Sequence, residues 1–442
     1  MKNNAEIEPV TVSEKAGRSG ETHPQGVELC IWSESMFAAL VKGVKGGKWY
    51  SLSDKAFSVK TLEAAFRKVK ANDGSAGVDR VTIARFEANL EKELPILSKA
   101  LMEGTYRPQA IKRVMIPKPG SAEKRPLGIP TVRDRVAQTA LRAALEPIFE
   151  HEFCDSSFGF RRGRSCHKAL ARTWRALKAG KVHVVDADLR KFFDTIPHEL
   201  IMRGLKTKVS DGKLLALVNL YLKQGVMEFG VDEAWESEMS EGTPQGSVIS
   251  PLLANIALHG MDLMAEEHGY ELVRYADDFV ILCSSKEEAE SALEDVKAWV
   301  DAAGLKLHPD KTRIVDFGSG ESFEFLGYDF RNGQVDPRSK SVQNLRNKIR
   351  DLTPQSGGKL SEIIAKLNSV FRGWYRYFRY GYGWVFPRVD GFVRRRLRAI
   401  LARRKRIGRY NYPKHNSLWP NAYFERLGLF SMERTHAERR TL

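Results

Sequence analysis

Apolar residues recur along this chain with two different spacings. Helical spacing, with apolar residues three or four positions apart, dominates from about residue 57 to residue 94 and again after residue 341. Short alternating or continuous apolar runs, which are typical of strands, lie at 106–130, 181–189 and 271–283. Helices that accompany an antiparallel hairpin in the middle of the chain predict an α+β fold.

The helical segments differ in how clearly they show an apolar face. The last of them has apolar residues at Val393, Leu397, Ile400 and Leu401, a stripe that predicts burial of one face. Pro147 is expected to kink or end its helix, because proline lacks the amide hydrogen. We expect helices over residues 32–41, 57–69, 86–94, 135–150, 166–179, 198–205, 213–222, 286–302, 342–349, 360–377 and 391–406.

Two adjacent carboxylates stand at the centre of the run Glu271–Cys283, which reads ELVRYADDFVILC. The apolar residues on either side predict two short strands, and aspartate is common in tight turns. Asp277 and Asp278 repel each other, and a bound Mg²⁺ would remove that cost. A solvated acidic turn is the alternative. A third carboxylate, Asp188, lies at the end of the predicted strand 181–189, and this favours a two-metal phosphoryl-transfer site.

Three motifs in a fixed order resemble one enzyme family. They are the DxxxxF pattern from Asp188 to Phe193, GTPQGSVISPLLANI from Gly242 to Ile256, and YADD from Tyr275 to Asp278. Together they resemble a reverse transcriptase, and more narrowly the reverse transcriptase/maturase proteins of bacterial group II introns. The resemblance covers nearly the whole chain. It implies an RNA-directed DNA polymerase of right-hand form, with fingers, palm and an α-helical thumb.

The resemblance also implies roles for individual residues. Asp188, Asp277 and Asp278 would be the catalytic residues and would hold two Mg²⁺ ions. Phe193 would be a steric gate whose bulky ring collides with a ribose 2′-OH and so favours dNTPs. Lys311 would assist the pyrophosphate leaving group. An ordinary surface cation is the alternative for each basic residue. The expected nucleotide-binding residues are Phe193, Gln245, Gly246, Arg125, Lys118 and Lys311.

Basic residues gather in two places that we expect to bind RNA. The loop Phe158–Ser165 (FGFRRGRS) resembles a family motif and suits contact with the template backbone. The segment Leu367–Phe378 mixes arginine with aromatic residues, a composition suited to phosphate contact and base stacking. Core packing is the alternative for its Trp374. The expected RNA-binding residues are Arg161, Arg162, Arg164, Arg372, Arg376, Arg394, Arg395, Arg398, Arg403 and Arg404.

The net charge of +16 is unevenly distributed. Residues 341–442 carry about +17, so residues 1–340 sum to about −1. A block this basic favours a polyanion-binding surface over a merely soluble one, and nucleic acid is the expected partner. Binding should weaken steeply with added salt, because each phosphate contact releases counterions.

Composition bears on where the protein is located in the cell and on which domains it contains. The first 26 residues are polar and lack the apolar core of a signal peptide, and no apolar run is long enough to span a membrane. The four cysteines form no CxxC pair, so we expect reduced thiols in a cytoplasmic protein and no zinc site. The resemblance implies that this cytoplasm is bacterial and that the protein is bound to nucleic acid. Because every cysteine precedes residue 284, we expect no C-terminal endonuclease domain with paired cysteines and histidines.

These features together predict a division into five segments. They are an N-terminal extension (1–55), fingers (56–180), a palm with the YADD hairpin (181–335), a helical thumb or maturase domain (336–412) and a C-terminal tail (413–442).

The expected partners are group II intron RNA, template RNA, primer DNA and dNTPs, and dimerisation is left open. One alternative is a domesticated reverse transcriptase in defence or repair. Another is an RNA-binding splicing factor with an inactive polymerase, which the three intact aspartates disfavour. An RNA-copying RNA polymerase is disfavoured by Phe193.

Overall fold

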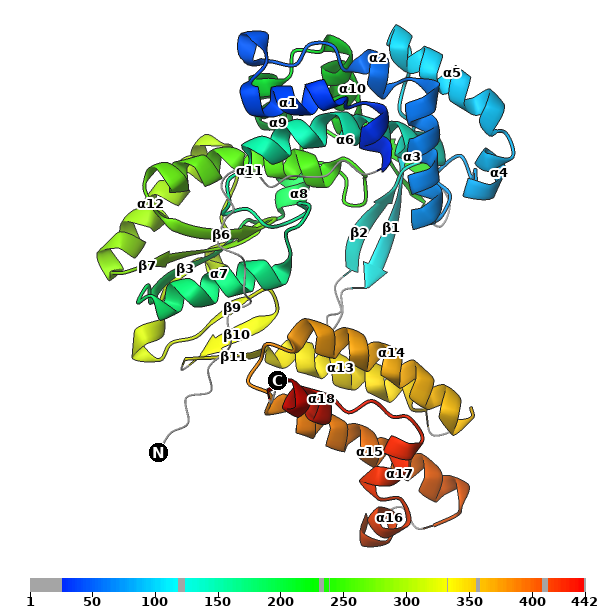
Figure 1. Cartoon of the computed structure of the whole chain (residues 1–442), viewed down its shortest axis with the longest axis vertical. Helices are drawn as coiled ribbons and strands as arrows, with labels where there is room; N and C mark the ends of the chain where they lie inside the picture. The colour runs from blue at the N-terminus through cyan, green and yellow to red at the C-terminus, as the bar shows by residue number, and fades with distance from the viewer. Residues whose placement is uncertain are drawn as a thin grey trace. The chain divides into compact units, whose positions relative to one another are not determined.

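The elements form two compact units in the computed structural model (Figure 1). Unit 1 comprises the described residues up to Ile314, and unit 2 comprises those from Val315 onward. The structure describes residues 26–117, 124–229, 234–237, 239–331, 333–354, 358–407 and 412–440.

Unit 1 begins with helices, several of which pack on the long helix α6 (Val132–Glu152). In α3 (Val59–Asn72), the Ser58 hydroxyl accepts a hydrogen bond from Thr61 N and caps the helix. The apolar face predicted for this helix is buried. The other elements before the first strand are η1 (Gly26–Cys30), α1 (Glu34–Lys42), η2 (Lys45–Gly47), α2 (Ser53–Ala56), α4 (Ile83–Glu87) and α5 (Leu90–Glu103).

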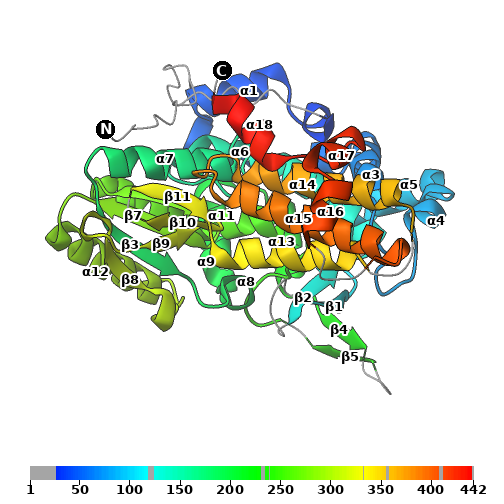
Figure 2. The same ribbon diagram turned by 90° about the horizontal axis from the view of Figure 1, so that it is seen from below.

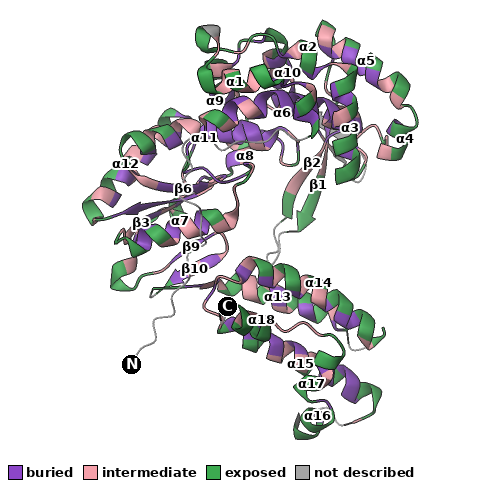
Figure 3. Ribbon diagram, viewed as in Figure 1, coloured by how far each residue is buried: buried purple, intermediate pink, exposed green. Residues whose placement is uncertain are grey.

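Helix α6 is buried along most of its length (Figure 3). Pro147 does not end this helix, which continues to Glu152. Proline cannot donate to the carbonyl four residues earlier, here that of Ala143. Trp32 Nε1 donates to that carbonyl instead, at 3.1 Å. The helix therefore continues past the proline with the Ala143 carbonyl satisfied by a different element.

A four-stranded sheet, with strand order β2-β1-β4-β5, follows the first helices (Figure 2). Strand β1 (Ile111–Pro117) pairs antiparallel with β2 (Lys124–Ile129), as the alternating sequence predicts. Strand β4 (Val226–Phe229) pairs with β1 in parallel, and β5 (Ala234–Ser237) pairs with β4 antiparallel. The sequence did not predict β4 and β5.

A second sheet carries two of the three family motifs. Its strands, in order, are β6 (Glu271–Tyr275), β7 (Asp278–Cys283), β3 (His183–Asp188) and β8 (Arg313–Asp316). Strand β7 is antiparallel to both of its neighbours, and all its residues after Asp278 are buried, which explains its continuous apolar sequence. The remaining helices of unit 1 are α7 (Cys166–Lys178), α8 (Phe192–Thr195), α9 (His198–Lys208), α10 (Gly212–Leu222), α11 (Ser250–Glu267), α12 (Lys286–Ala302) and η3 (Pro309–Lys311).

Unit 2 combines a small antiparallel sheet with a bundle of helices. The strands β9 (Phe323–Phe325), β10 (Tyr328–Arg331) and β11 (Gln334–Pro337) form the sheet. The apolar stripe predicted for α15 (Val385–Arg404) is buried in the bundle. The other elements are η4 (Phe317–Ser319), α13 (Ser339–Leu352), α14 (Leu360–Phe378), α16 (Tyr412–Leu418), α17 (Asn421–Arg426) and α18 (Met432–Arg440).

The predicted α+β fold is confirmed. The helix predicted over residues 86–94 is wrong, because α4 ends at Glu87 and α5 begins at Leu90. The other predicted helices each have a counterpart whose ends differ by a few residues. The two units separate after Ile314, whereas the sequence placed the end of the palm at residue 335. The five predicted segments remain a prediction. Among the helices that the structure describes, none is both long enough and apolar enough to cross a membrane.

Candidate active site

The three aspartates of the motifs lie at one end of the second sheet. Asp188, the last residue of β3, lies opposite Asp278, the first residue of β7. Asp278 also lies opposite Tyr275 across the hairpin, so Ala276 and Asp277 form a two-residue turn. Ala276 has a φ of 60°, the left-handed backbone that the first position of such a turn requires. The turn thus places Asp277 next to the paired carboxylates of the two strands.

One buried arginine fixes this turn to the rest of unit 1. Arg274, on β6, is fully buried, and its Nε donates to Asp262 Oδ1 of α11 at 2.7 Å. Its Nη1 donates to the Ala276 carbonyl at 2.9 Å and to Asn255 Oδ1 at 3.1 Å. Its Nη2 donates to Ser157 Oγ at 2.9 Å. Sequence reasoning missed this network, although an arginine inside a buried strand is an unusual residue that calls for a partner.

The turn also contacts the loop that precedes α7. A Cβ added to Gly159 would overlap the Ala276 backbone nitrogen, so only glycine allows the two backbones to approach this closely. Asn255 Nδ2 donates to the Gly159 carbonyl at 2.8 Å, and Phe158 N donates to the Arg274 carbonyl at 2.8 Å. The FGF part of this loop is therefore fixed against the turn that carries Asp277.

Tyr275, the first residue of the YADD motif, faces α7. Burial raises the pKa of its hydroxyl to about 12, and its contact with the Cys166 thiol adds to the increase. The tyrosine is therefore neutral at physiological pH, and we assign it a packing role beside the carboxylates.

Two basic side chains act on the carboxylates. Lys311 Nζ forms an ion pair with Asp188 Oδ2. Burial raises the pKa of Asp277 above its usual range, and the negative charge of Asp188 raises it further. The positive charges of Arg125 and Lys311 lower it. A cation added at this point would stabilise the ionised form of Asp277 and remove the repulsion between the carboxylates.

The donor set fits a divalent metal ion such as Mg²⁺, because hard carboxylate oxygens are its preferred ligands. The ammonium group of Lys311 on Asp188 shows that a positive charge is accommodated there. Asp188, Asp277 and Asp278 are the residues that could hold the ion. Across the described part of the chain, no three acidic, histidine or cysteine side chains already converge as a preformed metal cluster. Because Lys311 already pairs with Asp188, its ammonium group would compete with a metal ion for this carboxylate.

The loop from Gly242 to Val248 is attached to the segment that carries Phe193. Thr243 N donates to the Phe193 carbonyl at 2.7 Å, and Gly242 N donates to the Ile196 carbonyl at 2.8 Å. A Cβ at Gly242 would collide with backbone atoms of Phe193 and Asp194, so the glycine permits this close packing. The second and first motifs are thereby joined backbone to backbone.

The same loop is attached to strand β2 on its other side. Gly128 N donates to the Gln245 carbonyl at 2.6 Å, and a Cβ at Gly246 would overlap the Gly128 carbonyl oxygen. Arg125 lies on this strand, three residues before Gly128. The structure therefore brings Phe193, Gln245, Gly246 and Arg125, which were predicted from separate motifs, into one neighbourhood.

A glutamine on α6 holds the back of this loop. Gln138 is fully buried, and its Oε1 accepts hydrogen bonds from Ser247 Oγ at 2.8 Å and from Val248 N at 2.9 Å. Sequence reasoning missed Gln138 as well. A glutamine on an otherwise apolar helix face was the available signal, because a buried amide needs partners.

Known proteins share these motifs over most of the chain. Residues 116–330 match the family described as "Reverse transcriptase (RNA-dependent DNA polymerase)", and residues 342–417 match "Group II intron, maturase-specific domain". Protein YkfC of Escherichia coli (strain K12) is 34% identical over 291 residues, which are 57% of this chain and 74% of that protein. The chain belongs to the group II intron reverse transcriptase/maturase family. The predicted family is confirmed.

Two further matches differ in extent. The group II intron-encoded protein LtrA of Lactococcus lactis subsp. cremoris is 32% identical over 307 residues, and the match covers 54% of this chain. The chain spans 50% of that protein's length. A solved "Partial Cas6-RT-Cas1--Cas2 complex" is 25% identical, with a TM-score of 0.36, over 57% of this chain and 43% of that chain.

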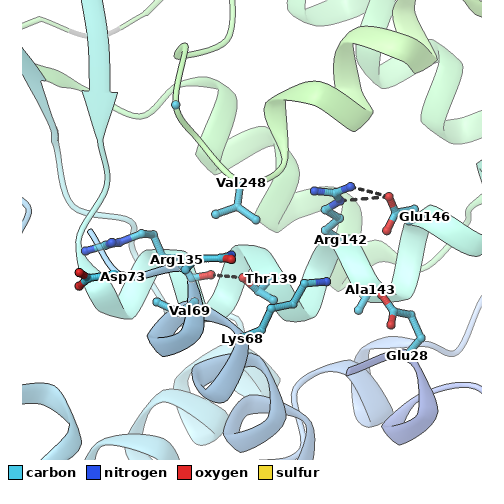
Figure 4. Close-up of a pocket in the computed structure, with 12 residues that line it drawn as sticks. Glu28, Lys68, Val69, Asp73, Arg135, Thr139, Arg142, Ala143, Glu146 and Val248 are labelled. Carbon is cyan, nitrogen blue, oxygen red and sulfur yellow. Dashed lines mark hydrogen bonds and ion pairs between the residues drawn. The ribbon is translucent and has the colours of Figure 1, made fainter. Parts of the chain in front are cut away.

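A pocket of about 260 Å³ adjoins the Gly246 end of the loop (Figure 4). Three basic residues and three acidic residues line it, and Arg142 donates to Glu146, one turn further along α6. Glu146 also pairs with Arg162, at 3.2 Å. Because its charges balance, the pocket is poorly suited to a phosphate group.

In this member of the family, the three arginines of the FGFRRGRS loop face acidic groups of unit 1. Arg161 is buried, and it donates to Glu150 and to several backbone carbonyls. This corrects the expectation that Arg161 contacts RNA. Arg162 pairs with Glu28 and Glu146. Arg164 pairs with Asp155, and this hydrogen bond lowers the pKa of the Asp155 carboxyl.

The arginines of unit 2 that were predicted to bind RNA differ in how far they are exposed. Arg398 is buried, and it donates to the Trp419 carbonyl at 2.8 Å and to Asn421 Oδ1 at 2.9 Å. This corrects the expectation for Arg398, which joins α15 to the C-terminal segment. The other predicted arginines of unit 2 are exposed or half-exposed, namely Arg372, Arg376, Arg394, Arg395, Arg403 and Arg404. Lys118, predicted to bind the nucleotide, lies outside the described residues.

Proposed function

We propose that this chain is an RNA-directed DNA polymerase that copies intron RNA into DNA, and that it also binds the intron RNA and assists its splicing and mobility. The observation that supports the proposal most strongly is the placement of Asp188, Asp277 and Asp278 at one end of the sheet that β6, β7, β3 and β8 form. Membership of the reverse transcriptase/maturase family supports it independently.

The three aspartates are proposed to hold two Mg²⁺ ions. When bound, Mg²⁺ activates the primer 3′-OH and neutralises charge on the triphosphate. Arg125 is close enough to Asp277 to lower the pKa of that carboxyl, so it is positioned to meet the phosphates of a nucleotide at the same place. Lys311, which pairs with Asp188, is proposed to assist the departure of the pyrophosphate through its positive charge.

The sugar of the incoming nucleotide is proposed to lie between Phe193 and the loop that holds Gln245 and Gly246. The backbone bond from Thr243 to Phe193 fixes the distance between these two elements. A ring at Phe193 would leave no room for a 2′-OH, which selects dNTPs over rNTPs. Gly246 would allow the nucleotide to approach the loop backbone.

The exposed arginines of unit 2 are proposed to bind intron RNA, template RNA and primer DNA. Residues 341–442 carry about +17, and the six exposed or half-exposed arginines named above lie on α14 and α15. Exposed arginines contact phosphates without strong sequence preference, so this surface would bind many RNAs and leave specificity to RNA shape.

Primer extension on an RNA template with Mg²⁺, with dNTPs and rNTPs in separate reactions, tests the polymerase proposal. Wild-type protein is expected to make DNA and little RNA. The double variant Asp277→Ala/Asp278→Ala, checked for folding by circular dichroism, is expected to make neither. Absence of DNA product from well-folded wild-type protein would overturn the proposal and leave RNA binding as the remaining function.

A further inference from the structure

An exposed aromatic residue in a strained backbone stands beside the proposed sugar gate. Phe160 has a φ of 60°, which L-residues with bulky side chains rarely adopt, and its side chain is 45% exposed. Both features are unfavourable for an isolated loop residue. Strain of this kind persists only where the surrounding structure imposes it, and it is concentrated at functional sites.

The neighbours of Phe160 impose its conformation. Phe158 and Arg161 are buried, and the Gly159 carbonyl accepts a hydrogen bond from Asn255 at 2.8 Å. Arg161 donates to the Cys154 and Ser157 carbonyls at 2.6 and 2.9 Å. The loop is thus fixed on both sides of Phe160, and this residue alone in the FGFR stretch directs a large apolar ring toward solvent.

The ring of Phe160 meets the ring of Phe193. Their centroids are 6.4 Å apart and their planes are inclined at 84°, an edge-to-face pair. Phe193 also contacts the buried Phe192, with ring centroids 5.5 Å apart. Phe193 therefore contacts one buried ring and one exposed ring. Removing the exposed ring would open space into which Phe193 could turn.

We infer that Phe160 is a positioning residue for sugar selection, because its ring prevents Phe193 from moving away from a ribose 2′-OH. This inference rests on the proposed function of Phe193 as the gate. It assigns Phe160 no contact with the reacting atoms. Discrimination between dNTPs and rNTPs would then depend on two rings, one that meets the sugar and one that supports the first.

The test is the ratio of dNTP to rNTP incorporation efficiency in single-nucleotide extension. Phe160→Gly removes the ring and suits the left-handed backbone, so it relieves strain while it deletes the contact. It should lower the ratio about 3- to 10-fold, the effect expected of one aromatic pair. Phe193→Ala should lower it about 100-fold. The double variant should match Phe193→Ala to within about twofold, because Phe160 acts through Phe193.

Two controls separate this role from general loop damage. Phe158→Leu alters a buried ring of the same loop and should slow both nucleotides equally, leaving the ratio unchanged. Phe160→Tyr keeps the ring edge and should preserve the wild-type ratio. If Phe160→Gly incorporates neither nucleotide, Phe160→Leu, which lacks the ring, supplies the ratio and should lower it.

The outcomes distinguish this inference from the proposed function. An unchanged ratio in Phe193→Ala would remove the gate, and the support from Phe160 with it. A relaxed ratio in Phe193→Ala with a wild-type ratio in the Phe160 ring-deletion variants would overturn this inference alone. A double variant much more relaxed than Phe193→Ala would also overturn it, since Phe160 would then act on the sugar directly.

Discussion

Two arginines of unit 1 and three arginines of unit 2 are placed in opposite ways. In unit 1, Arg161 and Arg274 are buried and donate to carboxylates and carbonyls that fix the loops of the candidate site. In unit 2, Arg372, Arg376 and Arg395 lie exposed on helices. An arginine in a basic motif can therefore be buried in internal hydrogen bonds or exposed to solvent, depending on whether acidic groups lie close enough to pair with it.

The number of acidic residues relative to basic residues differs between regions of the chain. Residues 341–442 contain 23 lysines and arginines but only 6 aspartates and glutamates, so internal pairing cannot neutralise that region. Residues 231–330, which include the YADD hairpin, carry about −16. Arginines of unit 1 such as Arg161 and Arg274 are thus used to build the site, whereas residues 341–442 keep an excess of positive charge that suits a polyanion.

The largest effect is expected from breaking the buried pair of Arg274 and Asp262. Arg274→Met should destabilise unit 1 by about 3–5 kcal/mol, because it leaves a buried aspartate without its partner. It should also reduce primer extension, since the Ala276 carbonyl loses a donor. Urea unfolding would measure the loss of stability.

The control is Arg172→Met. It breaks a more exposed ion pair with Glu271, which lies on β6 like Arg274, and it should cost about 1 kcal/mol or less. If both variants lost the same amount of stability, Arg274 would not have the special role of fixing the Ala276–Asp277 turn.

A second prediction concerns the exposed arginines of unit 2. The triple variant Arg372→Gln, Arg376→Gln and Arg395→Gln should keep wild-type thermal stability but bind RNA more weakly. The slope of log affinity against log salt should fall by about 2 to 3, because each arginine that is removed leaves about one RNA phosphate with its counterions. A filter-binding series at several salt concentrations measures it.

The matched control makes the same change of charge in unit 1. Arg67→Gln, Lys99→Gln and Lys286→Gln remove three exposed cations, each of which pairs with a glutamate four residues away. The RNA affinity of this variant should stay close to that of the wild type. A similar loss of affinity in both triple variants would mean that overall charge, and not the unit 2 surface, sets RNA binding.

The smallest effect concerns an acid of unit 1 that is held by backbone amides. Burial raises the pKa of Asp211, but hydrogen bonds from Leu52, Ser53 and Leu214 N–H groups outweigh it and leave the pKa below its usual value. The unfolded chain then binds more protons near pH 4, so this stabilisation is present above a pH of about 3.9 and is lost as pH falls through the folded pKa. Asp211→Asn should lower Tm by a few degrees at pH 7, and the difference should shrink below about pH 4. A difference that does not change with pH would contradict the assignment.

The sequence predicted the parts of the site that lie within short motifs. The YADD turn, Asp188 at a strand end and the helices with a clear apolar stripe could be read because their signals are local, within one strand, turn or helix face. The prediction that Gln245 and Phe193 lie near each other required only the assumption that the family motifs form one site. The structure adds the backbone bonds that join them.

The supporting network could not be predicted, because its members are far apart in sequence. Arg274 lies 12 residues from Asp262 but 117 residues from Ser157, and no local pattern links them. Arg161 was wrongly predicted for the same reason, since the FGFRRGRS motif does not reveal that the Glu150 side chain and four backbone carbonyls accept its hydrogen bonds. Pro147 failed as a helix-ending signal because its missing bond is compensated by Trp32, 111 residues from Ala143.

The central claim is that unit 1 builds the polymerase site while unit 2 supplies RNA affinity, and one paired measurement tests it. Primer extension on saturating template and RNA affinity without nucleotides would be measured for Asp277→Asn and for the unit 2 triple variant. The account predicts that Asp277→Asn abolishes extension and keeps wild-type RNA affinity, whereas the triple variant loses affinity and still extends primers when template is saturating. Loss of both activities in both variants would contradict it.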